Sequence, residues 1–136
     1  MRIPVANLRP LLAAAEPQWR ANLDALFAAG QFILGPQVAA FEREFAEATG
    51  AGFTVGVGNG TDAIALALRD AGVRGEVLTS ALTAPFTATA IRAAGCQPRF
   101  VDVDPGDLQM EVHDLVARAS GRTRGIVAVH LYGQPC

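Results

Sequence analysis

The chain has 136 residues, of which 51% are hydrophobic and 18% are charged, and its formal net charge is −2. This balance indicates a globular protein with a buried core and excludes a disordered chain. It gives no support for nucleic-acid binding, and no apolar run approaches the roughly 18 residues of a membrane-spanning helix. The chain has 11 basic residues other than histidine, and all of them are arginines, so it contains no lysine.

Two cysteines, Cys96 and Cys136, are too few for a disulfide framework and lack the spacing of metal ligands. We therefore expect two reduced thiols, a cytoplasmic location and no metal site. Prolines and polar residues interrupt the first part of the chain, which does not read as a signal peptide.

Residues 1–50 are expected to form an N-terminal helical segment. Residues 1–14 contain two prolines and are predicted to be extended. Apolar residues at helical spacing then predict one helix over residues 17–29 and a second over residues 36–49. Each ends at a glycine, and the second begins at a proline, whose fixed φ suits a first helical position.

From residue 51 onward, strand patterns alternate with helix patterns. The order predicts right-handed crossovers and an α/β fold, with a mainly parallel sheet covered by helices on both faces. The first and last strands are nearly all apolar and are expected to be covered on both sides. The predicted strands are 53–57, 76–79, 98–103 and 125–130, and the predicted helices are 60–71, 86–94 and 112–119.

The turn between the first strand and its helix reads Gly-Asn-Gly-Thr-Asp, from Gly58 to Asp62. A helix N-terminus presents unpaired N–H groups and partial positive charge, and glycine lets a phosphate approach the backbone closely. Thr61 and Asp62 can cap the helix or bind a ligand, so a purely structural turn is the alternative. The turn is not a P-loop, which needs a lysine, and no acidic residue closes the next strand as in a dinucleotide site.

Two other stretches carry side chains that could bind a ligand or take part in catalysis. Residues 79–89 are rich in small and hydroxyl side chains and could line a pocket in which Phe86 stacks on a ligand. In the alternative interpretation, Thr83 caps a helix and Phe86 belongs to the core. Asp102 and Asp104 could act as paired acids, although an Asp-Pro pair after a strand favours a turn. The two histidines assemble no recognisable catalytic set.

Taken together, the segments resemble the N-terminal part of sugar aminotransferases of the DegT/DnrJ/EryC1/StrS type. These are pyridoxal-phosphate enzymes whose large domain has the aspartate-aminotransferase fold, also called fold type I. Six groups of residues carry the resemblance, in this order: 32–36 with 41–42, 58–63, 81–83 with 90–91, 100–105, 123–124 and 129–133.

The resemblance implies transfer of an amino group, usually from glutamate, to a ketone on a nucleotide-linked sugar by a homodimer. It implies that Gly60, Thr61 and Asp62 bind the phosphate of pyridoxal 5′-phosphate. An aromatic residue that stacks on the pyridine ring is expected at position 84, which is Ala84 here, so Phe86 is the candidate for that role. Residues 51–136 would then form an incomplete cofactor-binding large domain.

The resemblance also implies a pyridine-binding aspartate and a Schiff-base lysine beyond the segment that matches. We therefore expect an N-terminal fragment that has part of the cofactor site, no catalytic residue and no activity by itself. Two alternatives stay open. One is a non-catalytic α/β module that binds phosphate or a small molecule, and the other is a module that dimerises through exposed apolar surface.

Overall fold

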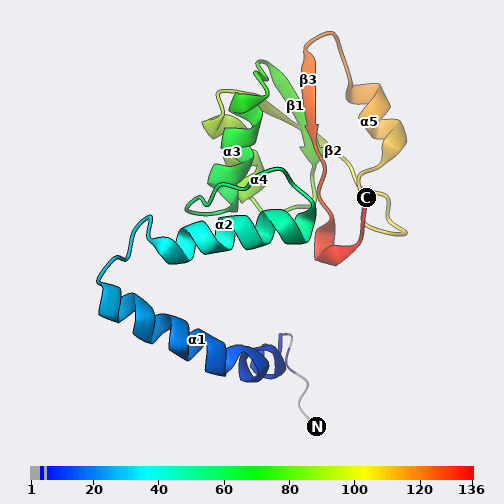
Figure 1. Ribbon diagram of the computed structural model, residues 1–136. Coiled ribbons are helices and arrows are strands. Elements are labelled where there is room, and N and C mark those ends of the chain that lie inside the picture. Colours follow the sequence, from blue (N-terminus) through cyan, green and yellow to red (C-terminus); the bar gives the residue numbers. More distant parts are fainter. Residues whose placement is uncertain (1–3, 5) are drawn as a thin grey trace. The chain divides into compact units, whose positions relative to one another are not determined.

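The computed structural model describes residue 4 and residues 6–136, and Figure 1 shows its elements. Within-chain contacts divide the chain into two compact units, Met1–Gly56 and Val57–Cys136. Each unit is described separately below. No helix in the described part of the chain combines the length and the apolar character needed to cross a membrane.

The N-terminal unit contains two helices, α1 (Arg9–Ala29) and α2 (Pro36–Thr49). The prediction for α2 is confirmed, but α1 begins before residue 17, so the predicted extended segment is wrong from Arg9 onward. The rest of that segment includes residues 1–3 and 5, which lie outside the described residues. Leucine and alanine between the two prolines of α1 favour the helix, and its first-turn proline needs no N–H partner there.

Both helices end at a glycine in the left-handed region, Gly30 with φ 65° and Gly50 with φ 70°. Other residues adopt this conformation only at a cost, which explains why glycine stops the two helices here. None of the described residues of α1 is buried, and Trp19 and Phe27 are 57% and 68% exposed.

The strand predicted over residues 53–57 does not form. These residues belong to no helix or strand and have no ladder partner in the described part of the chain. Phe53 and Val55 are 83% and 67% exposed, whereas the prediction placed them under helices on both sides. An apolar sequence can favour an extended backbone, but a strand also needs a neighbour to accept its hydrogen bonds.

The C-terminal unit is an α/β layer structure with a parallel sheet, as predicted. The sheet has three strands in the order β2-β1-β3, instead of the four expected. Figure 1 shows α3 and α4 on one side of the sheet and α5 on the other. The elements are α3 (Gly60–Asp70), β1 (Glu76–Ser80), α4 (Phe86–Ala93), β2 (Gln97–Val101), α5 (Val112–Arg118), β3 (Thr123–Val127) and the 3₁₀ turn η1 (Leu131–Gly133).

The core of this unit forms around β1, the central strand. All five of its residues are buried, and Leu78 pairs in register with Arg99 on β2 and Ile126 on β3. Val77 belongs to a cluster with apolar residues of α3 and α4, including Ile91. Ile126 is 53% exposed, so the expectation that the last strand is covered on both sides is wrong for this residue.

Asp114 joins the start of α5 to the segment after β2. Its carboxylate accepts hydrogen bonds from Nε of Arg118 at 2.5 Å and from the backbone N–H of Asp102 at 2.7 Å. These bonds, first the one from Arg118, hold the pKa of Asp114 below its ordinary value of 3.8. The carboxylate form is thus favoured by folding.

A depressed folded-state pKa has a definite consequence for stability. Asp114 stabilises the fold above its ordinary, unfolded pKa of 3.8, and this contribution is lost as the pH falls through the lower folded pKa. We expect Asp114→Asn to be less stable than the wild type at neutral pH and to lose less stability on acidification. Urea unfolding at a series of pH values measures both effects. Arg118→Gln should weaken the pH dependence of stability in the same way. A pH profile of unfolding that is the same in Asp114→Asn and in the wild type would contradict this role of Asp114.

Candidate phosphate-binding cleft

A cleft of about 590 Å³ lies within the C-terminal unit, next to the N-termini of α3 and α4. Helices of an α/β layer run antiparallel to the strands, so their N-termini lie at the carboxyl edge of the sheet. All four predicted cofactor-binding residues line this cleft, although they come from two segments. The lining residues are Asn59, Gly60, Thr61, Asp62, Ile64, Ala84, Phe86 and Thr87.

Asn59 caps α3, a role that the sequence analysis considered for Thr61 or Asp62 as one of two alternatives. Its side-chain Oδ1 accepts the backbone N–H of Asp62 at 2.9 Å, and its Nδ2 donates to Oδ2 of Asp62 at 3.0 Å. Asn59 is extended, with φ −168°, which is the backbone conformation of an N-cap residue. Helix α3 begins at Gly60, as predicted, so Thr61 and Asp62 lie inside its first turn and only Asn59 stands at the N-cap position.

The remaining donors of the first turn are free. The backbone N–H groups of Gly60 and Thr61, and the Thr61 hydroxyl, bond to no acceptor in the described part of the chain. A Cβ built on Gly60 would meet nothing within 4 Å, so space is open next to its backbone. Two amides and a hydroxyl at the positive end of an 11-residue helix form a donor set for an anion.

The opposite wall is the start of α4. Phe86 is the first residue of this helix and is 63% exposed, so the alternative that it belongs to the core is wrong. The N-cap position is Pro85, so Thr83 does not cap α4. The Thr83 hydroxyl instead lies 3.0 Å from that of Thr87, which is buried. The wall therefore presents an accessible aromatic ring and neutral groups.

The donor set suits a phosphate group held by neutral partners. The only charged residue that lines the cleft is Asp62, and its carboxylate is bound by Asn59. The lining includes no cation and no second acid, so these residues can bind and orient a phosphate but cannot form a covalent bond to an aldehyde. The residues present are therefore suited to binding the phosphate group of a cofactor, but they cannot react with the aldehyde carbon of that cofactor.

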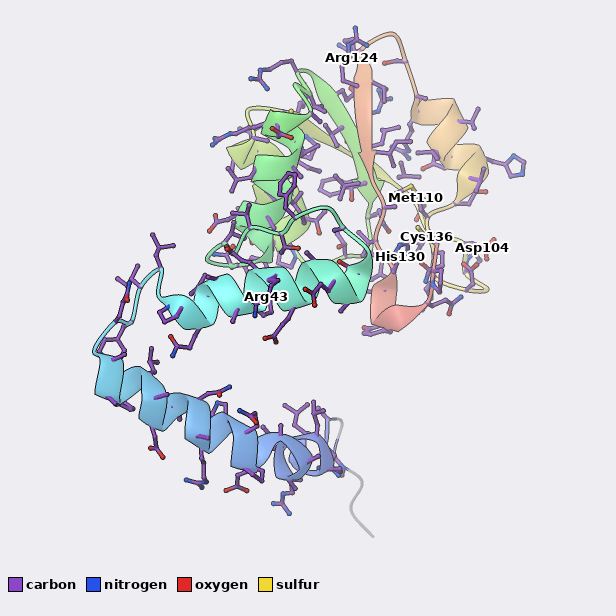
Figure 2. All side chains as sticks on the ribbon, in the orientation of Figure 1. Arg43, Asp104, Met110, Arg124, His130 and Cys136 are labelled. Carbon is purple, nitrogen blue, oxygen red and sulfur yellow. The ribbon has the colours of Figure 1, made fainter. Side chains whose placement is uncertain are left out.

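The other groups considered from sequence lie outside this cleft. Asp104 Oδ1 accepts the backbone N–H of Gly106 at 2.6 Å, which confirms the turn interpretation of the Asp-Pro pair. His130 follows β3 rather than ending it, and its Nδ1 accepts the backbone N–H of Cys136 at 3.1 Å; both residues are labelled in Figure 2. These contacts are local and support the backbone.

Two lining residues, Asn59 and Ile64, had no role in the sequence analysis or had a different one. Asn59 was read as part of a turn, although asparagine directly before a helical run is a strong N-cap signal. Ile64 lies one helical turn inside α3, and Thr87, the second residue of α4, belongs to the stretch 79–89 that was expected to line a pocket. Their place beside the cleft depends on how the two helices pack, which no local pattern shows.

The parallel sheet and the helix N-terminus at its carboxyl edge define an α/β protein with a candidate site for a phosphate-bearing ligand. A family model places the chain more narrowly: residues 14–136 match the DegT/DnrJ/EryC1/StrS aminotransferase family. The chain belongs to this family, as the sequence resemblance implied. Pyridoxal 5′-phosphate is the cofactor of the family.

Known relatives agree with this assignment. The chain is 38% identical over 136 residues to a protein of Geobacillus stearothermophilus named pleiotropic regulatory protein, covering 98% of the chain and 37% of the relative. It is 46% identical over 111 residues to dTDP-3-amino-3,4,6-trideoxy-α-D-glucose transaminase of Micromonospora megalomicea subsp. nigra, covering 80% of the chain and 30% of the relative.

Among solved structures, DesV of S. venezuelae in complex with a ketimine intermediate is similar at a TM-score of 0.89 and 30% identity. The match covers 99% of this chain and 37% of DesV. The chain thus spans about a third of the length of these proteins, between 30% and 37%.

Proposed function

We propose that this chain supplies the N-terminal part of the cofactor-binding large domain of a pyridoxal-phosphate aminotransferase. The substrate would be a nucleotide-linked keto sugar, with glutamate as the amino donor. The observation that carries this proposal is the unpaired donor set of Gly60 and Thr61 facing Phe86 in a family member. A cytoplasmic location belongs to the same proposal and is supported by the free thiols of Cys96 and Cys136.

When bound, pyridoxal phosphate supplies an electron sink for the transfer of an amino group. The chain's own residues would position it. The amides of Gly60 and Thr61 and the Thr61 hydroxyl would bind the phosphate, and Phe86 would pack against the ring. Asp62 would contribute by keeping Asn59 in its capping position, which holds the first turn of α3 open toward the ligand.

The same residues limit what the chain can do alone. With no lysine in the sequence, no side chain can hold the cofactor as a Schiff base. We therefore propose that this chain binds phosphate without covalent attachment and has no transaminase activity by itself. The alternative of a purely non-catalytic binding module makes the same prediction for phosphate but predicts no preference for a pyridine ring.

Pyridoxamine 5′-phosphate is a suitable probe because it has no aldehyde and cannot form an imine with the chain's terminal amine. We expect Thr61→Ala to weaken its binding about tenfold, as expected for a lost hydrogen bond to a charged group. Titration calorimetry of the full chain measures the change. Thr89→Ala, which removes an exposed α4 hydroxyl bonded to the Pro85 carbonyl, is the matched control.

Equal affinity of the wild type and Thr61→Ala for pyridoxamine phosphate would contradict the proposed phosphate site at Gly60 and Thr61. Binding of inorganic phosphate as tight as that of pyridoxamine phosphate would favour the non-catalytic alternative, because the ring would then add nothing. Phe86→Ala separates the two further, since only a ring-binding site should lose affinity for pyridoxamine phosphate and keep it for phosphate.

Homodimer formation is also part of the proposal. Leu11, Leu12 and Trp19 of α1 are 69%, 61% and 57% exposed, which leaves apolar side chains available to a second copy. We expect sedimentation velocity to show a dimer that Leu12→Glu dissociates, because a buried carboxylate without a partner opposes association. Glu16→Gln is a control on the same helix, and a monomer at all concentrations would contradict a dimer.

A further inference from the structure

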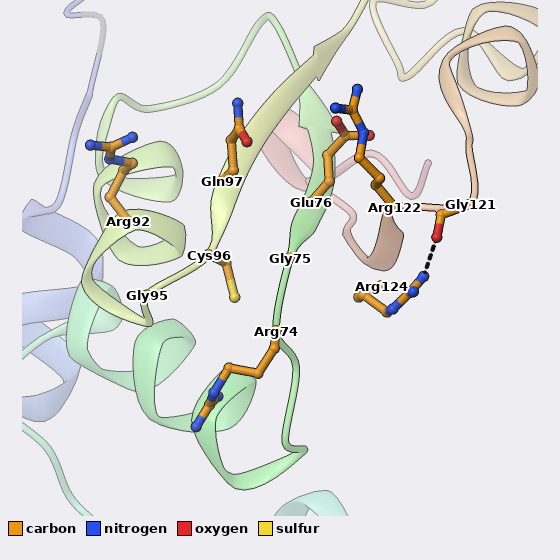
Figure 3. A pocket seen from close by; sticks show the side chains of 10 residues that line it. All are labelled: Arg74, Gly75, Glu76, Arg92, Gly95, Cys96, Gln97, Gly121, Arg122 and Arg124. Atoms are coloured by element: carbon orange, nitrogen blue, oxygen red, sulfur yellow. Dashed lines mark hydrogen bonds between the residues drawn. The ribbon is translucent and has the colours of Figure 1, made fainter.

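A second cleft, of about 650 Å³, lies at the amino ends of the three strands in the same unit. Figure 3 shows four arginines around it, from separate parts of the chain. Arg74 lies two residues before β1, Arg92 lies in the last turn of α4, and Arg122 and Arg124 lie just before and within β3. These four positions, out of 11 arginines, looked scattered in the sequence.

The positive charge of this cleft is not compensated by the protein. None of the four arginines has a carboxylate within 4.0 Å in the described part of the chain. The one carboxylate that lines the cleft, Glu76, is 7% exposed and is already paired with Nη1 of Arg99 at 3.2 Å. Glu76 also accepts a hydrogen bond from the Thr123 hydroxyl at 3.3 Å.

Backbone carbonyls orient two of the guanidinium groups. Arg124 Nη1 donates to the carbonyls of Gly121 and Thr123 at 2.8 and 2.9 Å, and Figure 3 marks the first of these bonds. Arg74 Nη1 donates to the carbonyl of Val73 at 2.8 Å. A guanidinium has five N–H donors, so each keeps donors for a ligand, and a carbonyl dipole does not cancel its charge.

Helix dipoles do not account for this cluster. A cation in the last turn of a helix is stabilised by the partial negative charge there, which explains Arg92. Arg74, Arg122 and Arg124 lie beyond the last turns of the helices, and the dipole effect falls off within the last turn, so it contributes little there. Gathering like charges in one open cleft costs free energy unless an anion offsets it, so the cluster indicates a ligand.

We infer that this arginine cleft binds an anion with two or more linked phosphate groups, through Arg74, Arg92, Arg122 and Arg124. Guanidinium groups match phosphate oxygens by paired hydrogen bonds, and several of them around one cleft favour a multivalent ligand. No aromatic side chain lines the cleft, so the site recognises the phosphate groups and makes no stacking contact with a base. The arginine cleft is separate from the candidate phosphate-binding cleft next to the N-termini of α3 and α4, which lies at the carboxyl edge of the sheet.

Calorimetric titration of the full chain with pyrophosphate, in about 20 mM salt to limit screening, tests the inference. We expect saturable binding that Arg92→Gln/Arg122→Gln weakens at least about tenfold, as expected for lost charge-assisted bonds. Arg20→Gln/Arg43→Gln removes the same charge from the N-terminal unit and should leave the affinity unchanged. ADP should bind as tightly as pyrophosphate, since the base makes no contact.

Equal losses in the two double variants would show a non-specific charge effect and overturn the inference, as would the absence of binding by the wild type. Thr61→Ala should bind pyrophosphate as tightly as the wild type does. A loss of affinity in this variant would place the ligand in the cleft next to the N-terminus of α3 instead. Circular dichroism checks that each variant is folded. As a second measurement on the unmodified chain, pyrophosphate should shift the amide NMR signals of Gly75, Gly95 and Gly121, and shifts confined to Gly60 and Thr61 would overturn the inference.

Discussion

Replacing Leu78 with alanine is expected to destabilise the C-terminal unit by about 2–5 kcal/mol. Leu78 is fully buried at the middle of the central strand, where β2 and β3 pair on either side of it. Alanine would leave a cavity that the two flanking strands hold open, because their backbone bonds to β1 prevent collapse. Since small domains are stable by about 5–15 kcal/mol, this loss is a large fraction of the total.

Urea unfolding followed by circular dichroism measures the effect. Leu66→Ala is the matched control, because Leu66 lies on α3 of the same unit and is 49% exposed. We expect the control to cost far less than the Leu78 variant, since its side chain already contacts solvent. Similar losses in both variants would show that the unit has no rigid core around β1.

Pyridoxal 5′-phosphate is expected to form no covalent adduct with any side chain of this protein. Schiff-base formation needs a primary amine, and the chain has no lysine, so only the terminal amino group qualifies. Arginine does not substitute because its guanidinium stays protonated. Transaminase turnover by the chain alone should therefore be absent, a complete loss relative to a family member with its lysine.

Reduction with borohydride followed by peptide mass spectrometry tests this expectation. Any pyridoxyl group should map to the first peptide only. Arg43→Lys is a positive control, because it places one amine on the exposed surface of α2 and should yield a second labelled peptide. Labelling of another side chain in the wild type, or measurable turnover with glutamate and a keto sugar, would contradict the proposal.

These two expectations depend on different kinds of information. The absence of lysine is a property of composition and needs no structure. The burial of Leu78 depends on which strands flank β1. The sequence predicted the strand itself, but its position at the centre of the sheet comes from the strand order β2-β1-β3.

The sequence alone determined the features that depend on neighbouring residues. Glycines at 30 and 50 ended α1 and α2, a proline started α2, and the alternation from residue 51 onward predicted parallel strands with helices between them, of which three strands form. The Gly-Asn-Gly-Thr-Asp turn predicted a helix N-terminus able to bind an anion. Such signals are local, because capping, turn conformation and hydrophobic period act over a few residues.

Only the tertiary structure decided the rest. Residues 53–57 have the composition of a strand and do not form one, because no strand among the described residues accepts their hydrogen bonds. Gly60 and Phe86 line one cleft because α3 and α4 pack together, and four arginines from Arg74 to Arg124 meet because three strands begin at one edge. Contacts between residues far apart in the chain follow from packing and strand order, which local patterns do not specify.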